Sequence, residues 1–422
     1  MSHIPHNRYP SVDEKAALAG TSGTPGTSNP YITDDDPRLT GTGGVISVVA
    51  AVSVFGSGRD GNLTFNGSAV TGFSLSGNTY TRTAKSDLHA DSVTISNNYS
   101  IDMAGFRFRA FSVTAGNSCA IHNDGYALDA TSASGSGAAP TTAATTSAGA
   151  IFYGGGNGAN GGSILTAGSS VGSAPTTLSS VVRYGGLGGA GGRGYFTAAY
   201  AGGAGGAISL NGTTAYHYYG DPWEILIGSF PYGRNGTAIV QVIGGSGGGT
   251  GGRRMSTGAS GDHTATIKGA PGGGGVLGVA IMSLLCGTNF RISCNGASVT
   301  YQNAFTGSIN YGGVGGNGGG GGGALAVIIG ELNGSNLPSF ETKGGNAGNG
   351  ISGGAGYGEG GCGGNGGLCL VYVGTNYVGG TPTCTAAGGT VGTNQDTGSI
   401  NPTWANTAGT AGTASYYEGA TG

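Results

Sequence analysis

Short runs of alternating apolar and small polar residues follow one another through residues 45–130. Asn and Gly, which favour turns, separate these runs at intervals of about 8–12 residues. The period of two predicts β-strands rather than amphipathic helix. The predicted strands are Asn62–Phe65, Gly72–Leu75, Thr79–Arg82, Ser92–Ile95, Phe106–Phe108 and Phe111–Val113.

A different unit repeats through residues 131–422: a glycine-rich tract, a short apolar strand and a turn. Such strands cannot bury their apolar faces alone, so we expect them to stack on one another. The predicted strands are Ala207–Leu210, Ala238–Ile243, Ala324–Ile329 and Leu368–Val373. The tracts include residues 185–194, 244–252, 269–275, 312–323, 344–356 and 358–367.

Several tracts keep two glycines in every three residues, as in GGLGGAGGR (185–193) and GGCGGNGGL (360–368). In an extended chain with three residues per turn, two of the three faces then carry no side chain. Neighbouring backbones can approach those faces and form hydrogen bonds. Ordering so much glycine costs conformational entropy, so we expect a dense network of interstrand hydrogen bonds to offset it.

Composition separates this chain from disordered and collagen-like proteins. Gly supplies 97 of the 422 residues and charged residues only 8%, yet 37% are hydrophobic, which is enough to form a core. Collagen needs strict Gly-X-Y with abundant Pro, and the chain has 13 Pro. We therefore expect an ordered, all-β protein.

Charge and hydropathy point to neither nucleic acid nor membrane. The net charge is −3, without a basic cluster. The longest apolar stretch, Val276–Cys286, is far shorter than the roughly 18 residues of a membrane span. The first residues lack the apolar core of a secretory signal, so we expect no export.

Residues 1–44 form a third part with few apolar residues. A capping-box pattern at Ser11–Glu14 is followed by a Ser/Thr/Gly/Pro stretch at 21–30. Such a segment has no core of its own, so we expect an extended arm that is ordered only against a partner. The predicted organisation is an arm (1–44), a β-rich domain (45–130) and a glycine-rich body (131–422).

The string EKAALAGTSGTPGTSNPYITDDDPRL, residues 14–39, resembles a segment of phage tail and fibre proteins. In those proteins it lies near the junction between the virion-attachment region and the fibre. The resemblance implies that the arm anchors the chain to other virion proteins. The anchoring residues would be Tyr31, Asp34, Asp35, Asp36 and Arg38.

Two further resemblances concern the fold. Residues 91–125 resemble rungs of a parallel β-solenoid in phage glycine-rich proteins, and the tracts resemble the polyglycine-II sandwich of distal tail-fibre adhesins. They imply an all-β fold of solenoid-like rungs and polyglycine-II-like stacked strands. They also imply a tail fibre or spike on the virion surface, made in the host cytoplasm. By family analogy it would be a homotrimer that contacts the host surface.

One aromatic segment, YHYYGDPWE at residues 216–224, is a candidate receptor contact. Aromatic rings pack on sugar rings, but the same segment could instead cover the end of the stack or form an oligomer contact. The aromatic residues are Tyr216, Tyr218, Tyr219 and Trp223. Asp221 and Glu224 would supply the carboxylate pair of a glycosidase, a role that we consider less favoured than binding.

No pattern in the sequence indicates catalysis, a cofactor or a metal. The tracts carry Asn, Ala or Cys where a calcium-binding repeat needs Asp. The six cysteines form no CxxC pair, so we expect reduced, buried thiols, with Cys362–Cys369 as a pairing under oxidation. Three alternatives stay open: a capsid or neck decoration fibre, a glycan-depolymerising tailspike, and a bacterial cell-surface glycine-rich protein.

Overall fold

The computed structural model describes residues 54–84, 86–125, 185–195, 199–200, 244–245, 247–249, 251, 253–255, 264–266, 271–300, 304–306, 311–354, 357–396 and 406–419. Contacts divide the chain into Met1–Ser57 and Gly58–Gly422, and the sheets belong to the second unit. Among the described residues only Val54 and Phe55 are helical, and none forms a helix that could span a membrane. The all-β prediction is confirmed.

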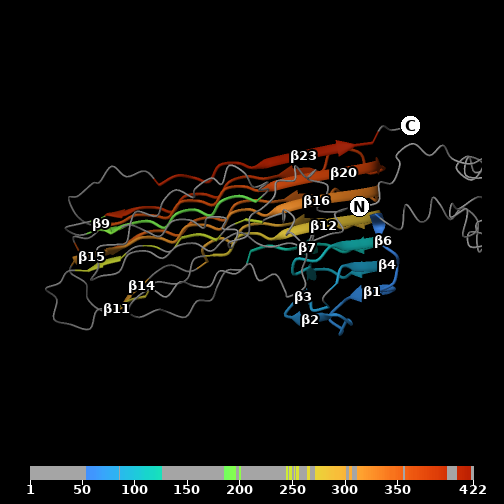
Figure 1. Cartoon of the computed structure of the whole chain (residues 1–422), viewed down its shortest axis with the longest axis horizontal. Helices are drawn as coiled ribbons and strands as arrows, with labels where there is room; N and C mark the ends of the chain where they lie inside the picture. Colours follow the sequence, from blue (N-terminus) through green and yellow to red (C-terminus); the bar gives the residue numbers. More distant parts are fainter. Residues whose placement is uncertain are drawn as a thin grey trace, which may run out of the picture. The chain divides into compact units, whose positions relative to one another are not determined.

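Seven parallel strands form the first sheet, called sheet A (Figure 1). Each strand pairs in parallel with the next. In spatial order they are β1 (Asn62–Phe65), β4 (Leu88–Ile95), β6 (Phe108–Ala115), β12 (Val276–Cys286), β16 (Ala324–Asn333), β20 (Leu368–Asn376) and β23 (Thr413–Glu418). The spatial order follows the chain order, so each strand is added beside its predecessor.

A second seven-stranded sheet, called sheet B, follows the same order. Its first pair is antiparallel and the later pairs are parallel. The strands are β2 (Phe73–Ser76), β3 (Thr79–Arg82), β5 (Ser100–Asp102), β7 (Ala120–His122), β13 (Arg291–Ser293), β17 (Ser339–Glu341) and β21 (Thr383–Thr385). One sheet A strand, a turn and the following sheet B strand make a unit that we call a rung.

The turns after β4, β6 and β12 are alike because the same conformation recurs in them. Asn98, Ser118 and Asn289 all have positive φ, between 55° and 65°. Asn tolerates this left-handed region better than most residues. The turns are also tied together, since the Asn97 side-chain oxygen accepts the Asn117 N–H at 2.8 Å. Consecutive rungs are thereby held in one register.

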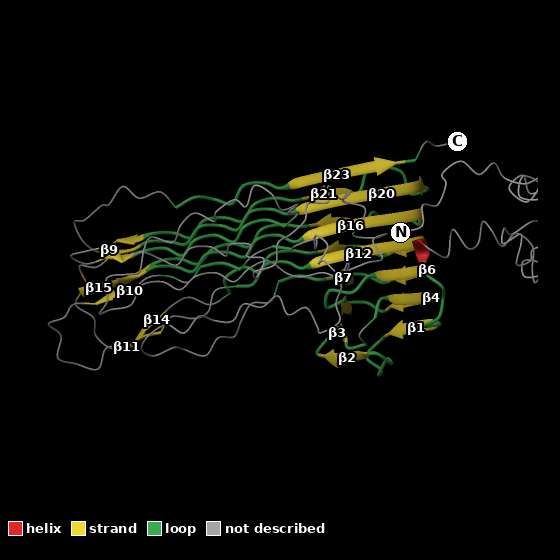
Figure 2. Ribbon diagram, viewed as in Figure 1, coloured by secondary structure: helices red, strands yellow, loops and turns green. Residues whose placement is uncertain are grey.

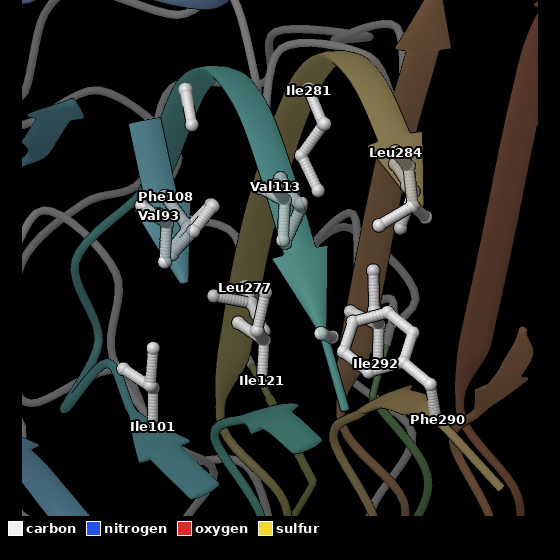
Figure 3. Packing of buried hydrophobic residues seen from close by; sticks show 14 of the residues in the cluster. Val93, Ile101, Phe108, Val113, Ile121, Leu277, Ile281, Leu284, Phe290 and Ile292 are labelled. Atoms are coloured by element: carbon white, nitrogen blue, oxygen red, sulfur yellow. The ribbon is translucent and has the colours of Figure 1, made fainter. Parts of the chain in front are cut away.

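The core lies between the two sheets, and it is built from residues that repeat from rung to rung. Val93 and Val113 of sheet A are in register, and they face Ile101 and Ile121 of sheet B (Figure 3). These side chains are almost completely buried. Each rung buries its apolar face only when a neighbour covers it, as the sequence predicted.

Different side chains close the two ends of this core. At the first end Phe65 contacts Phe73 and Tyr80 edge-to-face, with ring centroids 5.0 and 4.9 Å apart. At the other end the half-buried Tyr416 donates its hydroxyl to Glu418 at 3.0 Å. Aromatic and polar residues in these positions cover apolar side chains that stacking leaves without a neighbour.

The sheets are open at their edges, so the structure shows parallel stacking but no closed coil. Both sheets continue from the strands before residue 126 to those after residue 270, because β6 pairs with β12 and β7 with β13. The predicted strand pair Phe106–Phe108 and Phe111–Val113 is a single strand, β6. The predicted strands Ala207–Leu210 and Ala238–Ile243 lie outside the described residues.

Candidate functional site at the glycine tracts and their loop end

After the sheet B strand of each later rung, the chain leaves the two sheets through an extended outgoing tract. It returns to the next sheet A strand through an extended incoming tract. Outgoing tracts follow β13, β17 and β21 and span residues 294–300, 342–350 and 386–394. Incoming tracts precede β12, β16, β20 and β23 and span residues 271–275, 315–323, 359–367 and 406–412. The tracts run side by side from the two sheets to a group of short strands at their other end (Figure 2).

The tract 359–367 donates its amides to three neighbours in turn. Every third amide goes to the same neighbour, with N···O distances of 2.8–3.1 Å. Gly360 is the exception, since its N–H donates to the Asn394 side-chain oxygen at 2.9 Å. The neighbours are residues 342–348, 187–193 and 407–410. A flat β-strand has neighbours on two sides only, whereas a chain with three residues per turn presents its amides in three directions.

The tract 315–323 is surrounded more completely. Its amides donate to residues 359–365, 294–297 and Gly249, and its carbonyls accept from residues 186–192, 345–348 and Gly274. Six segments of the chain therefore enclose one extended tract. Backbone groups satisfy each other there without help from side chains, which is what burial of this backbone requires.

The glycine content of a tract matches its surroundings. A Cβ atom placed on Gly186 or Gly189 would meet the backbone of Asn365 or Cys362, whereas Leu187 and Ala190 carry side chains on the remaining face. In the enclosed run 318–323 every position faces the backbone of another segment. The glycine faces expected from the sequence are therefore the faces along which backbones touch.

Asparagine side chains extend this network at positions that are not glycine. The Asn346 side-chain oxygen accepts the Thr390 N–H at 2.9 Å. Asn365 accepts the Thr410 N–H at 2.9 Å, and Asn317 accepts the Gly251 N–H at 2.9 Å. Asn346 is exposed, but Asn317 is buried at 1% exposure.

We expect Asn317→Ala to lower the free energy of unfolding by about 1–3 kcal/mol, because it leaves the buried Gly251 N–H without this acceptor. Asn346→Ala is the matched control, since water can replace an exposed acceptor, and its effect should be below about 0.5 kcal/mol. Denaturant unfolding of both variants measures the difference. Equal destabilisation by the two changes would contradict the buried role of Asn317.

At the end of the tracts that is distant from the two sheets, short antiparallel strands pair with one another. β15 (Tyr311–Val314) pairs with β10 (Arg253–Met255) and with β18 (Ile351–Gly354). β19 (Tyr357–Gly358) pairs with β8 (Gly194–Tyr195) and β22 (Gln395–Asp396). β8 also pairs with β9 (Ala199–Tyr200), and β11 (Thr264–Thr266) pairs with β14 (Ala304–Thr306). We call this region the loop end.

An ion pair joins two tracts next to the loop end. Arg193 Nε lies 3.8 Å from Glu359 Oε2, and the same oxygen accepts the Arg193 backbone N–H at 3.0 Å. Burial raises the pKa of Glu359, and the hydrogen bond and charge of Arg193 oppose that rise. A carboxylate engaged in this way fixes the register of tracts 185–193 and 359–367.

A second group of buried charges lies where β4 and β6 begin. Asp87 Oδ1 accepts the Arg107 backbone N–H at 3.0 Å, and Arg107 Nη1 lies 3.5 Å from Asp87 Oδ2. The nearby Arg82 lies 3.8 Å from Asp60. Burial lowers the pKa of Arg107, and the charge of Asp87 opposes that change. These contacts fasten strand β4 to β6.

Asp102, His122 and Ser293 lie in register across sheet B, a residue combination seen in hydrolases. The geometry does not support catalysis. Ser293 is completely buried, and its hydroxyl contacts Asp124 at 3.1 Å. Burial raises the pKa of Asp102. The part of the chain that the structure describes holds no group of three or more metal-ligating side chains.

The site residues predicted from the sequence lie outside the described residues. This applies to the anchoring set Tyr31, Asp34, Asp35, Asp36 and Arg38, and to the aromatic set Tyr216, Tyr218, Tyr219 and Trp223. The residues 201–243, which include the aromatic set, follow β9 in the sequence. The described chain resumes at Gly244. The N–H of the next residue, Gly245, donates to the carbonyl of Gly274, which lies shortly before β12 in the sequence.

Comparison with known proteins gives no relative for this chain. No protein family, no curated protein and no solved structure matches it.

Proposed function

We propose that this chain is a non-enzymatic structural component of a phage virion, a tail fibre or spike that projects from the particle and contacts the host surface. The arm 1–44 would attach it to other virion proteins. The stacked rungs and tracts would form the rigid body, and the loops between tracts would contact a glycan or protein of the host.

The observation that carries this proposal is the enclosure of tract 315–323 by six other segments through backbone hydrogen bonds. We infer a polyglycine-II-like lattice, since the three-residue period of the amides is the period of that helix. A lattice of this kind needs no charged or catalytic side chain, and it holds the loops of the loop end on a stiff support.

The stacked rungs support the second part of the proposed fold. Each rung consists of a sheet A strand, a turn and a sheet B strand, and its parallel neighbours bury its apolar face. We propose that this is a solenoid-like stack in which outgoing and incoming glycine tracts separate successive rungs. Assembly as a homotrimer is part of the proposal, by analogy with phage fibres.

Labelling of virions tests the location. Gold-labelled antibody against the purified chain should mark the tail of phage particles that encode it. Label on the head would favour a decoration fibre, and absence of label from particles would overturn the proposal.

Host contact is tested by competition. Excess purified protein should block phage adsorption. Alanine replacement of Tyr216, Tyr218, Tyr219 and Trp223 together should weaken that block at least about tenfold. Alanine replacement of Tyr377 and Tyr417, which are 64% and 51% exposed, is the control and should leave it intact.

A further inference from the structure

Two cysteines face each other across the core in the last complete rung. Cys369 belongs to β20 of sheet A and Cys384 to β21 of sheet B, and their sulfur atoms are 3.0 Å apart. In the preceding rung the positions in register with them hold Leu325 and Phe340. The last rung thus replaces a large apolar pair by two thiols in contact.

We propose that Cys369 and Cys384 are a modification site, at which a small disulfide oxidant forms an intramolecular disulfide between sheets A and B. Disulfide bonds are about 2.05 Å long, so the two sulfur atoms have only about 1 Å to close. The strands that carry them are already fixed by parallel pairing to the preceding rung.

The two thiols have different roles in that reaction. Cys369 is completely buried, whereas Cys384 is half-buried. The hydrogen bond between the thiols lowers the pKa of Cys384 and raises the pKa of Cys369. Cys384 is therefore the first thiolate and the accessible nucleophile.

With oxidised glutathione the exchange proceeds in two steps. The Cys384 thiolate attacks one glutathione sulfur, the glutathione S–S bond breaks, and one glutathione thiolate leaves. Cys369 then attacks Cys384 Sγ in the mixed disulfide and expels the second glutathione. The proton of Cys369 passes to a departing thiolate. Two protein thiols are oxidised, and the reagent is reduced to two thiols.

The position of the two cysteines in the stack explains how the bond would stabilise the protein. β21 is the last strand of sheet B, whereas sheet A continues to β23. β21 therefore has a paired neighbour on one side only, whereas β20 is paired on both sides. The sheet B half of this rung should open more readily than the inner units. A covalent link in this rung would hold the two sheets together where stacking is weakest.

The other cysteines have different surroundings. Cys119 donates to the Ser96 carbonyl at 3.0 Å, and Cys286 donates to the Asn336 carbonyl at 3.3 Å. Burial raises the pKa of Cys286 to about 11. Cys294 is completely buried, and Cys362 lies in a glycine tract. The structure therefore favours Cys384 as the partner of Cys369 over the Cys362 suggested by the sequence.

Peptide mapping of the full chain tests the proposal. Folded protein is treated with oxidised glutathione, unfolded, alkylated and digested with chymotrypsin, which cuts after Tyr372 and Tyr377 and so separates the two cysteines. The expected product is one pair of linked peptides carrying Cys369 and Cys384, lighter by two hydrogen atoms than the reduced peptides. The remaining cysteines should be alkylated.

Cys384→Ser should abolish the link and Cys362→Ser should leave it intact. Oxidation should raise the thermal-unfolding midpoint of the wild type and of Cys362→Ser. It should leave the midpoint of Cys384→Ser unchanged. Linkage of Cys369 to Cys362 or to Cys294, or full alkylation of both thiols in the wild type, would overturn the proposal. The wild-type map decides the matter even if a variant fails to fold, and it does not depend on the proposed virion role.

Discussion

Gly364→Ala should lower the free energy of unfolding by about 3 kcal/mol or more, a large effect for the addition of one methyl group. A Cβ atom at this position would meet the backbone of Gly320, and the Gly319 carbonyl oxygen would lie 3.0 Å away. Backbone cannot rotate aside as a side chain can. Making room would pull apart tracts that the Gly364 N–H to Gly345 carbonyl bond, at 3.0 Å, helps to hold.

The matched control is Cys362→Ala in the same tract, at a position that already carries a side chain. We expect a change of less than about 1 kcal/mol for this variant. Thermal and denaturant unfolding, followed by circular dichroism, compare the two. Similar stabilities for both variants would mean that the tracts are not packed backbone against backbone.

Asp87→Ala is the second substitution with a large expected effect, about 3–5 kcal/mol. It removes the acceptor of the Arg107 backbone N–H and leaves the Arg107 guanidinium, whose side chain is 4% exposed, without its carboxylate. Removing a carboxylate from beside a buried charge is costly because no water replaces it. Denaturant unfolding gives the magnitude.

Two further variants separate charge from hydrogen bonding. Asp87→Asn keeps an acceptor for the Arg107 N–H but removes the charge, so its effect should lie between those of wild type and Asp87→Ala. Lys343→Ala breaks the more exposed pair with Glu341, 3.0 Å apart, and should cost less than about 1 kcal/mol. A wild-type stability for Asp87→Asn would show that the ion pair contributes nothing.

The apolar pattern predicted five strands of sheet A, namely β1, β4, β6, β16 and β20. It did not predict β12, which appeared only as an apolar stretch, or β23. In sheet B the predicted strands Gly72–Leu75 and Thr79–Arg82 correspond to β2 and β3. The strands from β5 onward were missed, since a three-residue strand such as Ser100–Asp102 contributes one inward side chain, Ile101, and shows no period. A usable signal existed nevertheless. Ile101, Ile121 and Ile292 each follow an Asn- or Gly-containing turn at the same distance from the preceding strand.

The glycine tracts were partly predictable. Their three-residue period indicates which faces lack side chains, but all such faces are chemically alike. The sequence therefore does not reveal that Gly186 bonds to Gly322, which is far along the chain. The contact between Cys369 and Cys384 was missed for a similar reason, because it depends on how the two sheets face each other.

The three-residue period of the tracts restricts how this chain can change in length. Inserting one residue into tract 359–367 would turn all later side chains by a third of a revolution, so that Asn365 or Leu368 would point into a neighbouring backbone. Insertions at the loop end do not change the directions in which the side chains of the tracts point. Variation in length should therefore collect at the loop end, where new loops can be exchanged without rebuilding the scaffold behind them.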